Sequence, residues 1–352
     1  MGQVIAGRFE LIAPLAGGGQ GTVWLAHDRV RGRRCAAKVL AQADSAVLLR
    51  FVREQGVQVD HPHLASPYGW AAADHEVAIA MPLVAGGSLE GALADHGPLS
   101  EPLVACVLLQ VLDGLATLHA AGWVHRDVKP ANVLLEPTGT GEPHARLGDM
   151  GLAIRADDPR LTMAGLLPGT PGYVSPEAAA GAGPDPAQDL WAAGATAARL
   201  LRPEVELDGG PAVDDVLAAV ASSELAAVLG RDGLLSADPA QRRSAAAAAP
   251  DTLAGLARSA LPSGGHLTAA GEPFEVFDHT ADHGLDDLVP AAAPHRDVTP
   301  ASPPVAPATP RTPAAAAAAP VPAAGGPVAW PGVVLLILGG LALLVALLVL
   351  VL

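Results

Sequence analysis

A short stretch around residue 127 concentrates side chains whose types and spacing suit phosphoryl transfer. Within residues 125–135 (HRDVKPANVLL), Asp127 precedes Lys129 by two positions and Asn132 by five, in a loop that leads into an apolar strand. A second carboxylate, Asp149, stands beside a glycine after the next apolar segment. Asp149 and Asn132 offer the hard oxygen ligands that Mg²⁺ prefers. Asp127 is then available to accept a hydroxyl proton, and Lys129 to neutralise a moving phosphoryl group.

A glycine-rich stretch and a lysine upstream would complete a nucleotide site. Residues 15–23 (LAGGGQGTV) separate two expected strands, 9–15 and 23–27. Because glycine has no Cβ, backbone amides there can approach phosphate oxygens closely. Lys38 lies in a third apolar strand, 35–40, where an ammonium group needs a phosphate or a carboxylate as its partner. Taken singly, these signals also fit an ordinary hairpin and a solvated lysine.

The elements expected to carry these residues form two lobes. The strands come first, and after about residue 98 apolar residues recur at the spacing of three and four that indicates helices. The periodic positions are Leu103, Val107, Leu108, Val111, Leu112, Leu115 and Leu118. The sequence therefore predicts an α+β arrangement in which a small β-rich lobe precedes a large helical lobe.

Composition limits the class of protein. The 352 residues are 50% hydrophobic and 16% charged, which allows a sizeable core. The 21 Lys and Arg against 36 Asp and Glu give a formal charge of −15, which argues against a nucleic-acid partner. Two cysteines, Cys35 and Cys106, support neither a disulfide framework nor a metal site, and they fit a reducing compartment. We expect no signal peptide at the N-terminus.

The C-terminal part of the chain changes character twice. Residues 263–327 are rich in Pro and Ala and are predicted to form an extended, disordered linker. Its acidic stretch, 272–287, contains Phe274 and Phe277; a docking patch is one interpretation, and we favour a solvated linker. Residues 328–352 end in 20 consecutive Val, Leu, Ile, Ala and Gly residues. As a helix these would span about 30 Å, so we expect one C-terminal transmembrane helix.

Taken together, these motifs resemble the eukaryotic-like (Hanks-type) serine/threonine protein kinase family, in particular its bacterial membrane-anchored receptor-type branch. The resemblance runs from about Phe9 to Ser244. It implies a two-lobed protein-kinase fold over 1–262, with an N-lobe of about 1–84 and a C-lobe of about 85–262. It also implies ATP with Mg²⁺, or alternatively Mn²⁺, as cofactors, and protein substrates that carry Ser or Thr.

The resemblance assigns site roles in both lobes. Lys38 would hold the α- and β-phosphates, and Asp127 would be the catalytic base. Asn132 and Asp149 would bind Mg²⁺, while Lys129 is typical of the serine/threonine-specific members. The other residues expected around the nucleotide are Leu15, Gly17, Gly18, Gly21, Val23, Glu54, Met81 and Leu83.

Within that nucleotide set, three residues have more specific roles by resemblance. Glu54 would pair with Lys38, Met81 would be the gatekeeper, and Leu83 would lie in the hinge, whose backbone meets adenine.

Regulatory and structural residues follow from the same resemblance. Phosphate on Thr162 or Thr170 would order the activation segment through charge-assisted bonds to Arg126. The residues expected to hold the C-lobe together are Glu177, paired with Arg242, and Asp189, which would brace the catalytic loop.

Some positions depart from the family pattern. Ala16 and Met150 stand where the family has glycine and phenylalanine, and the stretch from Glu54 to His61 is about two residues short. These departures leave a nucleotide-binding pseudokinase or scaffold as the alternative to an active enzyme. We expect the active kinase, as a single-pass cell-membrane protein with its kinase domain in the cytoplasm. The sequence leaves open whether it forms a homodimer, which protein it phosphorylates and what activates it.

Overall fold

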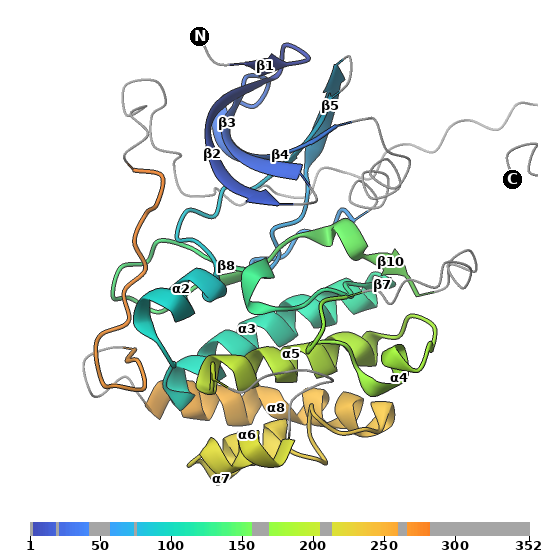
Figure 1. Cartoon of the computed structure of the whole chain (residues 1–352), viewed down its shortest axis with the longest axis vertical. Helices are drawn as coiled ribbons and strands as arrows, with labels where there is room; N and C mark the ends of the chain where they lie inside the picture. The colour runs from blue at the N-terminus through green and yellow to red at the C-terminus, as the bar shows by residue number, and fades with distance from the viewer. Residues whose placement is uncertain are drawn as a thin grey trace, which may run out of the picture. The chain divides into compact units, whose positions relative to one another are not determined.

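The computed structural model describes residues 3–18, 21–41, 57–73, 76–156, 169–204, 213–259 and 266–281. All of them fall within residues 1–292, which form one unit. In this unit an N-terminal β-sheet precedes a larger set of helices, in the order that the sequence predicts (Figure 1). The predicted transmembrane helix, 328–352, and the predicted linker beyond residue 281 lie outside the described residues.

The N-terminal sheet consists of antiparallel strands in the order β1-β2-β3-β4-β6-β5. Their bounds are β1 (Val4–Ile5), β2 (Phe9–Gly18), β3 (Gly21–Asp28), β4 (Arg33–Ala41), β5 (Gly69–Ala73) and β6 (Glu76–Met81). Because successive side chains of a strand alternate between faces, Phe9 and Leu11 of β2 share a face, as do Cys35 and Ala37 of β4. These side chains belong to one small core beneath the sheet.

The β2–β3 hairpin carries the glycine-rich stretch. Gly18 pairs with Gly21 across a turn whose residues, 19–20, lie outside the described part of the chain. At Gly21, φ is +116°, and a Cβ atom would lie 2.5 Å from the carbonyl oxygen of Val39. Only glycine fits there, so the hairpin can close tightly onto β4, the strand that carries Lys38.

The second lobe consists mainly of helices. They are α2 (Leu89–His96), α3 (Glu101–Ala120), α4 (Pro176–Ala179), α5 (Pro186–Leu201), α6 (Val213–Ala219), α7 (Ser223–Leu229) and α8 (Pro239–Ser259). The hydroxyl of Ser100 caps α3 by accepting a hydrogen bond from the amide of Leu103. Among the described residues, α3 is the one helix long and apolar enough to cross a membrane, and here its apolar residues form the protein core.

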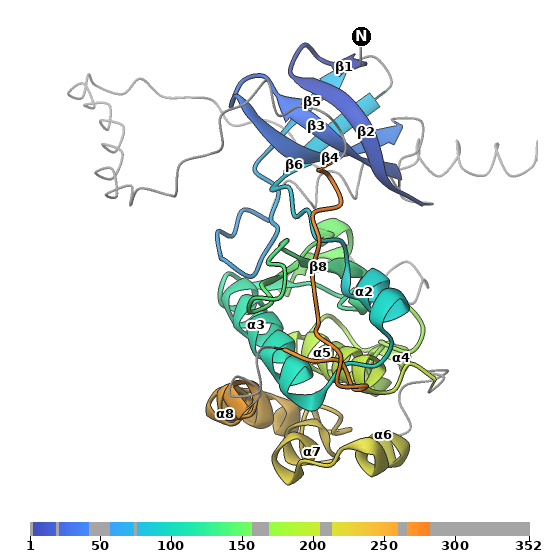
Figure 2. The ribbon, with the colours of Figure 1, turned by 90° about the vertical axis from the view of Figure 1, so that its left-hand side faces the viewer.

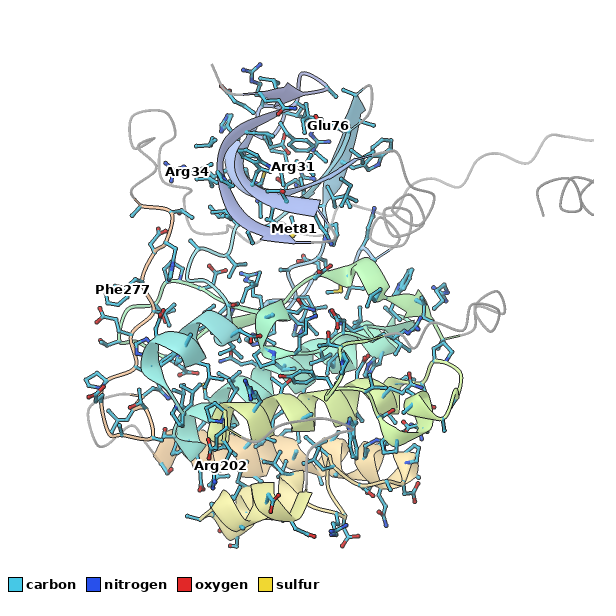
Figure 3. All side chains as sticks on the ribbon, in the orientation of Figure 1. Arg31, Arg34, Glu76, Met81, Arg202 and Phe277 are labelled. Carbon is cyan, nitrogen blue, oxygen red and sulfur yellow. The ribbon has the colours of Figure 1, made fainter. Side chains whose placement is uncertain are left out.

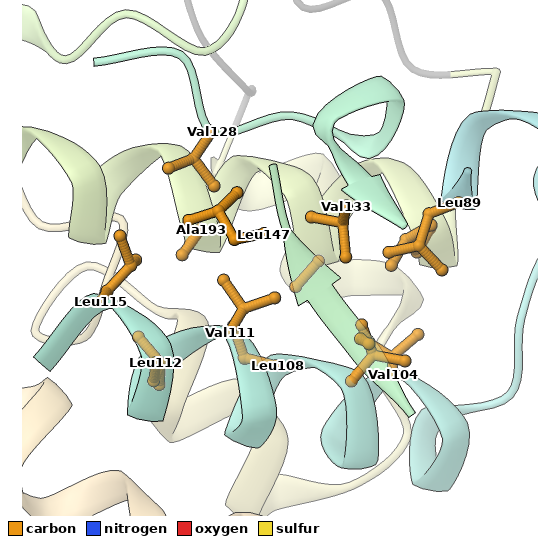
Figure 4. Packing of buried hydrophobic residues seen from close by; sticks show 14 of the residues in the cluster. Leu89, Val104, Leu108, Val111, Leu112, Leu115, Val128, Val133, Leu147 and Ala193 are labelled. Carbon is orange, nitrogen blue, oxygen red and sulfur yellow. The ribbon is translucent and has the colours of Figure 1, made fainter. Parts of the chain in front are cut away.

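Two short antiparallel ladders connect this core to the polar loops. One pairs β8 (Val133–Leu135) with β9 (Ala145–Leu147), and the other pairs β7 (Trp123–Val124) with β10 (Ile154–Arg155). The short 3-10 helix η1 (Pro130–Asn132) directly precedes β8, and η2 (Met150–Leu152) lies between β9 and β10. Figure 4 shows Val128, Val133 and Leu147 packed with Val111 of α3 and Ala193 of α5. Valines that alternate with the polar residues of the 125–135 stretch thus fix that loop to the core.

Residues 266–281, which we call the strap, form an extended segment packed on the helical lobe. Phe274 is fully buried in the main core and Val276 is 4% exposed, whereas Phe277 is 59% exposed. The backbone amide of His279 reaches Ala85, just after the N-terminal sheet. Figures 1 and 2 show the strap in orange, running past α2 toward that sheet.

The sequence predicts a disordered linker from residue 263, and over the strap this prediction is wrong. Phe274 and Val276 are two residues apart and are both buried, while Phe277 is exposed, which is the alternation of an extended segment with one buried side. The acidic residues around them dominate the composition and conceal this short pattern. Phe274 packs beside His96 of α2, a partner that is distant in sequence, at 5.1 Å between ring centroids.

Candidate active site

Asp127 is the centre of a hydrogen-bonded cluster in the loop before η1. Its Oδ2 lies 2.9 Å from Nζ of Lys129 and accepts a hydrogen bond of 2.9 Å from Nδ2 of Asn132. Its Oδ1 accepts a hydrogen bond of 2.8 Å from the hydroxyl of Thr170. Asp127 is only 6% exposed, so these contacts set the orientation of a largely buried carboxylate. The structure therefore brings Asp127, Lys129 and Asn132 together and adds Thr170 to them.

Thr170 is predicted from the sequence as a phosphorylation site, and the structure places its hydroxyl inside the catalytic cluster. Oγ1 accepts a hydrogen bond of 2.7 Å from Lys129 and donates its own hydrogen to Asp127. A phosphate ester on Oγ1 would remove that hydrogen and put a dianion beside the Asp127 carboxylate, which like-charge repulsion disfavours. In this geometry Thr170 positions the carboxylate. Thr162, the other predicted site, lies outside the described residues.

Asp189 of α5 accepts hydrogen bonds from the backbone of the loop that precedes Asp127. Its Oδ2 accepts a hydrogen bond of 2.8 Å from the amide of His125, and its Oδ1 accepts one of 2.8 Å from the amide of Arg126. Arg126 has a φ of +70°, a left-handed conformation that is costly for a residue with a Cβ, and this bond holds it there. The predicted regulatory arginine and the predicted bracing aspartate are thus direct neighbours.

The carboxyl group of Asp189 stays ionised although it is fully buried. Burial alone would raise its pKa, but the interaction with His119, whose Nε2 lies at 2.8 Å, and the hydrogen bond from the amide of Arg126 help to outweigh burial and hold the pKa below its ordinary value. Sequence reasoning missed His119, which comes at the end of α3. Nothing in the sequence marks this histidine, because its partner is 70 residues away.

His125 connects the catalytic loop to the segment that carries Asp149. Its buried ring accepts a hydrogen bond of 3.2 Å at Nδ1 from the amide of Asp127. The proton must therefore be on Nε2, which donates to the carbonyl oxygen of Gly148 at 3.0 Å. The His125 ring thus connects the loop that carries Asp127 to the segment that carries Asp149. His125 belongs to the 125–135 motif, but nothing in the sequence indicates its role.

Lys38 and Asp149 join the two lobes through an ion pair. Nζ of Lys38 lies 2.8 Å from Oδ1 of Asp149, and Lys38 is 6% exposed. Burial would raise the pKa of the Asp149 carboxyl, but the charge and hydrogen bond of Lys38 outweigh burial, so the pKa lies below its ordinary value. The amide of Gly151 donates to the same carboxylate oxygen at 3.3 Å. The side chains with the predicted phosphate and metal roles therefore meet at one point.

The strand register gathers the predicted nucleotide residues near this pair. Val23 pairs with Lys38, and Met81 pairs with Ala36 two positions before Lys38. Figure 3 shows Met81 at the end of the sheet that faces the helical lobe. The other described members of the predicted set are Leu15, Gly17 and Gly18 in β2, Gly21 in β3, and Leu83 just after β6. Glu54, the predicted partner of Lys38, lies outside the described residues.

Arg242 of α8 holds the chain that follows Thr170. Its fully buried guanidinium forms an ion pair with Glu177 and donates hydrogen bonds to the carbonyl oxygens of Ala187, at 2.9 Å, and Ser236, at 2.7 Å. It also lies over the ring of Trp191, 5.7 Å from the ring centroid. The segment that carries Thr170 is therefore anchored to the helical core by one buried cation.

The donor set of Asn132 and Asp149 fits Mg²⁺. Nδ2 of Asn132 donates to the carbonyl oxygen of Asp127 at 2.7 Å and to Oδ2 of Asp127 at 2.9 Å, which uses both of its hydrogens. The amide oxygen of Asn132 is then the atom left to bind a cation, together with a carboxylate oxygen of Asp149. The described residues contain no cluster of three His, Cys, Asp or Glu side chains able to hold a metal alone. Proteins commonly bind Mg²⁺ through one or two such groups plus substrate phosphates.

Comparison with known proteins places this site in a family. The family described as "Protein kinase domain" matches residues 9–248. The chain is 36% identical to the serine/threonine-protein kinase PkaA of Streptomyces coelicolor over 226 residues, which cover 60% of this chain and 41% of that protein. It is 37% identical to the serine/threonine-protein kinase PknA of Mycobacterium tuberculosis over 204 residues, which cover 55% of this chain and 46% of that protein.

A third relative, the serine/threonine-protein kinase PkaB of Streptomyces coelicolor, is 37% identical over 60% of this chain and 52% of its own length. The matches thus span about half or less of each of these relatives. The family match covers most of the chain and includes both lobes, the catalytic cluster, the Lys38–Asp149 pair and the Glu177–Arg242 anchor. This chain belongs to the protein kinase domain family.

Proposed function

We propose that this chain is an active serine/threonine protein kinase that transfers the γ-phosphate of ATP to protein hydroxyl groups. The observation that carries the proposal is the cluster in which Asp127 is held by Lys129, Asn132 and Thr170. Such a cluster presents an oriented carboxylate beside a cation, which is what proton removal and charge neutralisation in phosphoryl transfer require. Similarity to serine/threonine-protein kinases such as PkaA, PkaB and PknA supports the same activity.

The residues divide the work of transfer between the lobes. Lys38 would exchange its bond with Asp149 for the nucleotide phosphates, while the glycine-rich hairpin covers them. Asn132 and Asp149 would hold Mg²⁺, which neutralises phosphate charge when bound. Asp127 would accept the proton of the attacking hydroxyl at its carboxylate, and Lys129 would balance the charge of the transferred group. Because Asp189 and His125 already fix these groups, catalysis would come mainly from positioning.

The proposed preference for serine and threonine rests on Lys129, which is typical of the serine/threonine-specific members of the family, and on its partner Thr170. Lys129 donates a hydrogen bond of 2.7 Å to the hydroxyl of Thr170, and both side chains contact the Asp127 carboxylate, to which the substrate hydroxyl would give its proton. The complete set of Lys38, Asp127, Asn132 and Asp149 side chains argues against the pseudokinase alternative.

Tethering to the cell membrane by one C-terminal helix, with the kinase domain in the cytoplasm, is part of the proposal. Its support is the apolar run at 333–352 and the need of a kinase for cytoplasmic ATP. Cell fractionation tests it: the full chain should be found with membranes, and a chain shortened to residues 1–327 should not. Equal membrane recovery of both would remove the tether from the proposal.

The activity is tested by phosphate transfer from labelled ATP with the purified full chain. Asp127→Asn should lower kcat by about 10²- to 10⁴-fold, the usual contribution of a general base, and should leave nucleotide binding intact. The matched control is Asp113→Asn, because Asp113 is an acid on α3 whose side chain is 60% exposed. Transfer that is absent from the wild type, or equal in wild type and Asp127→Asn, would overturn the proposal.

A further inference from the structure

The lower part of the strap is built into the fold of the helical lobe. Phe274 is fully buried in the main core, and its amide donates to the carbonyl oxygen of His266 at 2.9 Å. The amide of Ala269 donates to the carbonyl oxygen of Pro98 at 2.9 Å, just before α3. Nε2 of His96, in α2, lies 3.2 Å from the carbonyl oxygen of Glu275. The strap therefore has a fixed position before it reaches the upper end of the lobe.

At its upper end the strap contacts the chain that follows Met81. The amide of His279 donates a hydrogen bond of 2.9 Å to the carbonyl oxygen of Ala85. A Cβ atom at Gly86 would lie 2.4 Å from Cγ1 of Val276 and 2.6 Å from the carbonyl oxygen of Leu135. Gly86 is thus enclosed between the strap and β8, with room for no side chain.

Residues 85–87 are also held by backbone hydrogen bonds to β8, the strand that follows Asn132. The amide of Gly86 donates to the carbonyl oxygen of Leu135 at 2.8 Å, and the amide of Leu135 donates to Gly87 at 2.9 Å. Val276 exchanges two backbone hydrogen bonds, of 2.9 and 3.0 Å, with Gly139 in the β8–β9 connection. Residues 85–87 are therefore held on one side by the hairpin that follows Asn132 and on the other by the strap.

We infer that the strap is a structural part of the nucleotide site: Val276, packed against Gly86, and the backbone amide of His279, bonded to Ala85, position the chain that binds ATP. The inference rests on the proposed function, because it takes the chain from Met81 to Val84 as the segment that meets adenine. Residues 81–84 are continuous with residues 85–87, so the backbone position of residues 81–84 depends on the contacts that hold residues 85–87. If the strap were released, the backbone of residues 81–84 would sample several positions, of which one binds ATP. The apparent affinity for ATP would then fall in proportion to the population of that position.

A purely stabilising role of the strap makes a different prediction. Packing of Phe274 alone would affect the free energy of unfolding and would leave the KM for ATP unchanged in the folded enzyme. Positioning by His279 affects the KM for ATP and the Kd for nucleotide, while kcat at saturating ATP and the KM for a peptide substrate stay close to wild type.

The first experiment compares His279→Pro with His279→Ala in the full chain. Proline removes the N–H that binds Ala85, whereas alanine removes the ring and keeps the N–H. His279→Pro should raise the Kd for Mg²⁺-ADP and the KM for ATP by roughly two- to tenfold, the range that one net backbone hydrogen bond supports. His279→Ala should stay within about twofold of wild type on the same basis. Equal nucleotide affinity in the two variants and the wild type would overturn the inference.

The second experiment needs no variant and therefore does not depend on the folding of one. Coupling between two sites is reciprocal, so nucleotide that is favoured by the docked strap must in turn favour docking. Mg²⁺-ADP should slow hydrogen exchange at the amides of Val276 and His279 in the wild type, while amides of the distant helix α7 serve as the internal control. Unchanged exchange in the strap at saturating ADP would overturn the inference. A wild type that binds ADP but transfers no phosphate would instead contradict the proposed function.

Discussion

The hydroxyl of Thr170 donates a hydrogen bond of 2.8 Å to Oδ1 of Asp127 across 43 residues of sequence. The other oxygen of that carboxylate faces Lys129 and Asn132. Both oxygens are thus held, and the carboxylate cannot rotate without losing at least one partner. Thr170, which lies in the expected activation segment, therefore takes part in aligning the carboxylate that is predicted to act as the catalytic base.

Replacement of Thr170 tests this alignment. Thr170→Val keeps the shape of the side chain and removes the hydroxyl, so kcat should fall by about tenfold or more, as expected for a lost hydrogen bond to a charged group. Thr170→Ser retains the hydroxyl and should stay within about threefold of wild type. Steady-state kinetics at saturating ATP and peptide measure both. Equal kcat values for Val and Ser would contradict the positioning role.

The Lys38–Asp149 pair predicts a linked change in activity and in ionisation. Lys38→Met should lower kcat by about 10²- to 10³-fold, the usual cost of removing one donor from developing charge. The substitution also removes the charge and the hydrogen bond of Lys38 that lower the pKa of Asp149, so burial, opposed by the weaker hydrogen bond from Gly151, should then raise that pKa. Titration of the Asp149 carboxyl by NMR should show a higher pKa in the variant than in the wild type. An unchanged or lower pKa would show that Lys38 does not control this carboxylate.

Asp189 predicts a pH-dependent stability. Asp189→Asn leaves one acceptor oxygen for the two amides of His125 and Arg126 and places an NH2 donor against the other amide, so it should lower the free energy of unfolding by about 2–4 kcal/mol at pH 7. The folded pKa of Asp189 lies below its unfolded value, so its contribution is present above the unfolded pKa of about 4 and is lost as pH falls through the folded pKa.

Urea unfolding of wild type and Asp189→Asn at a series of pH values measures this contribution. The difference between the two proteins should be constant between pH 6 and 7, and should shrink as pH falls below about 4. A difference that grows toward acid would mean that the carboxyl group of Asp189 is protonated in the folded protein.

The Glu177–Arg242 pair predicts strong coupling in a double-mutant cycle. Arg242→Met leaves Glu177 and two buried carbonyl oxygens without their donor, and should cost about 3–5 kcal/mol of unfolding free energy. Adding Glu177→Gln removes the unpaired charge and should recover part of that loss. Urea denaturation of the wild type, both single variants and the double variant provides the coupling energy. Strictly additive losses would show that the two side chains act independently.

The side chains of the candidate catalytic cluster could be located from the sequence because phosphoryl transfer needs particular residue types at short spacing. The Asp127, Lys129 and Asn132 pattern lies within six residues, and Asp149 follows two residues after β9. Thr170 could be located but its role could not, because a threonine in an activation segment looks the same whether it carries phosphate or binds the base. His119 had no signal at all, because its function depends on the distant Asp189.

By itself, then, the sequence determined the order of the lobes, the glycine that the β2–β3 hairpin requires and the polar groups of the catalytic loop. These features depend on local spacing and on backbone conformations that single residue types allow. Only the tertiary structure decided that Lys38 meets Asp149, that Thr170 holds Asp127, and that the strap closes on residues 85–87. Each of these contacts joins segments far apart in the chain, and the burial that makes them favourable exists only once the helical core has formed.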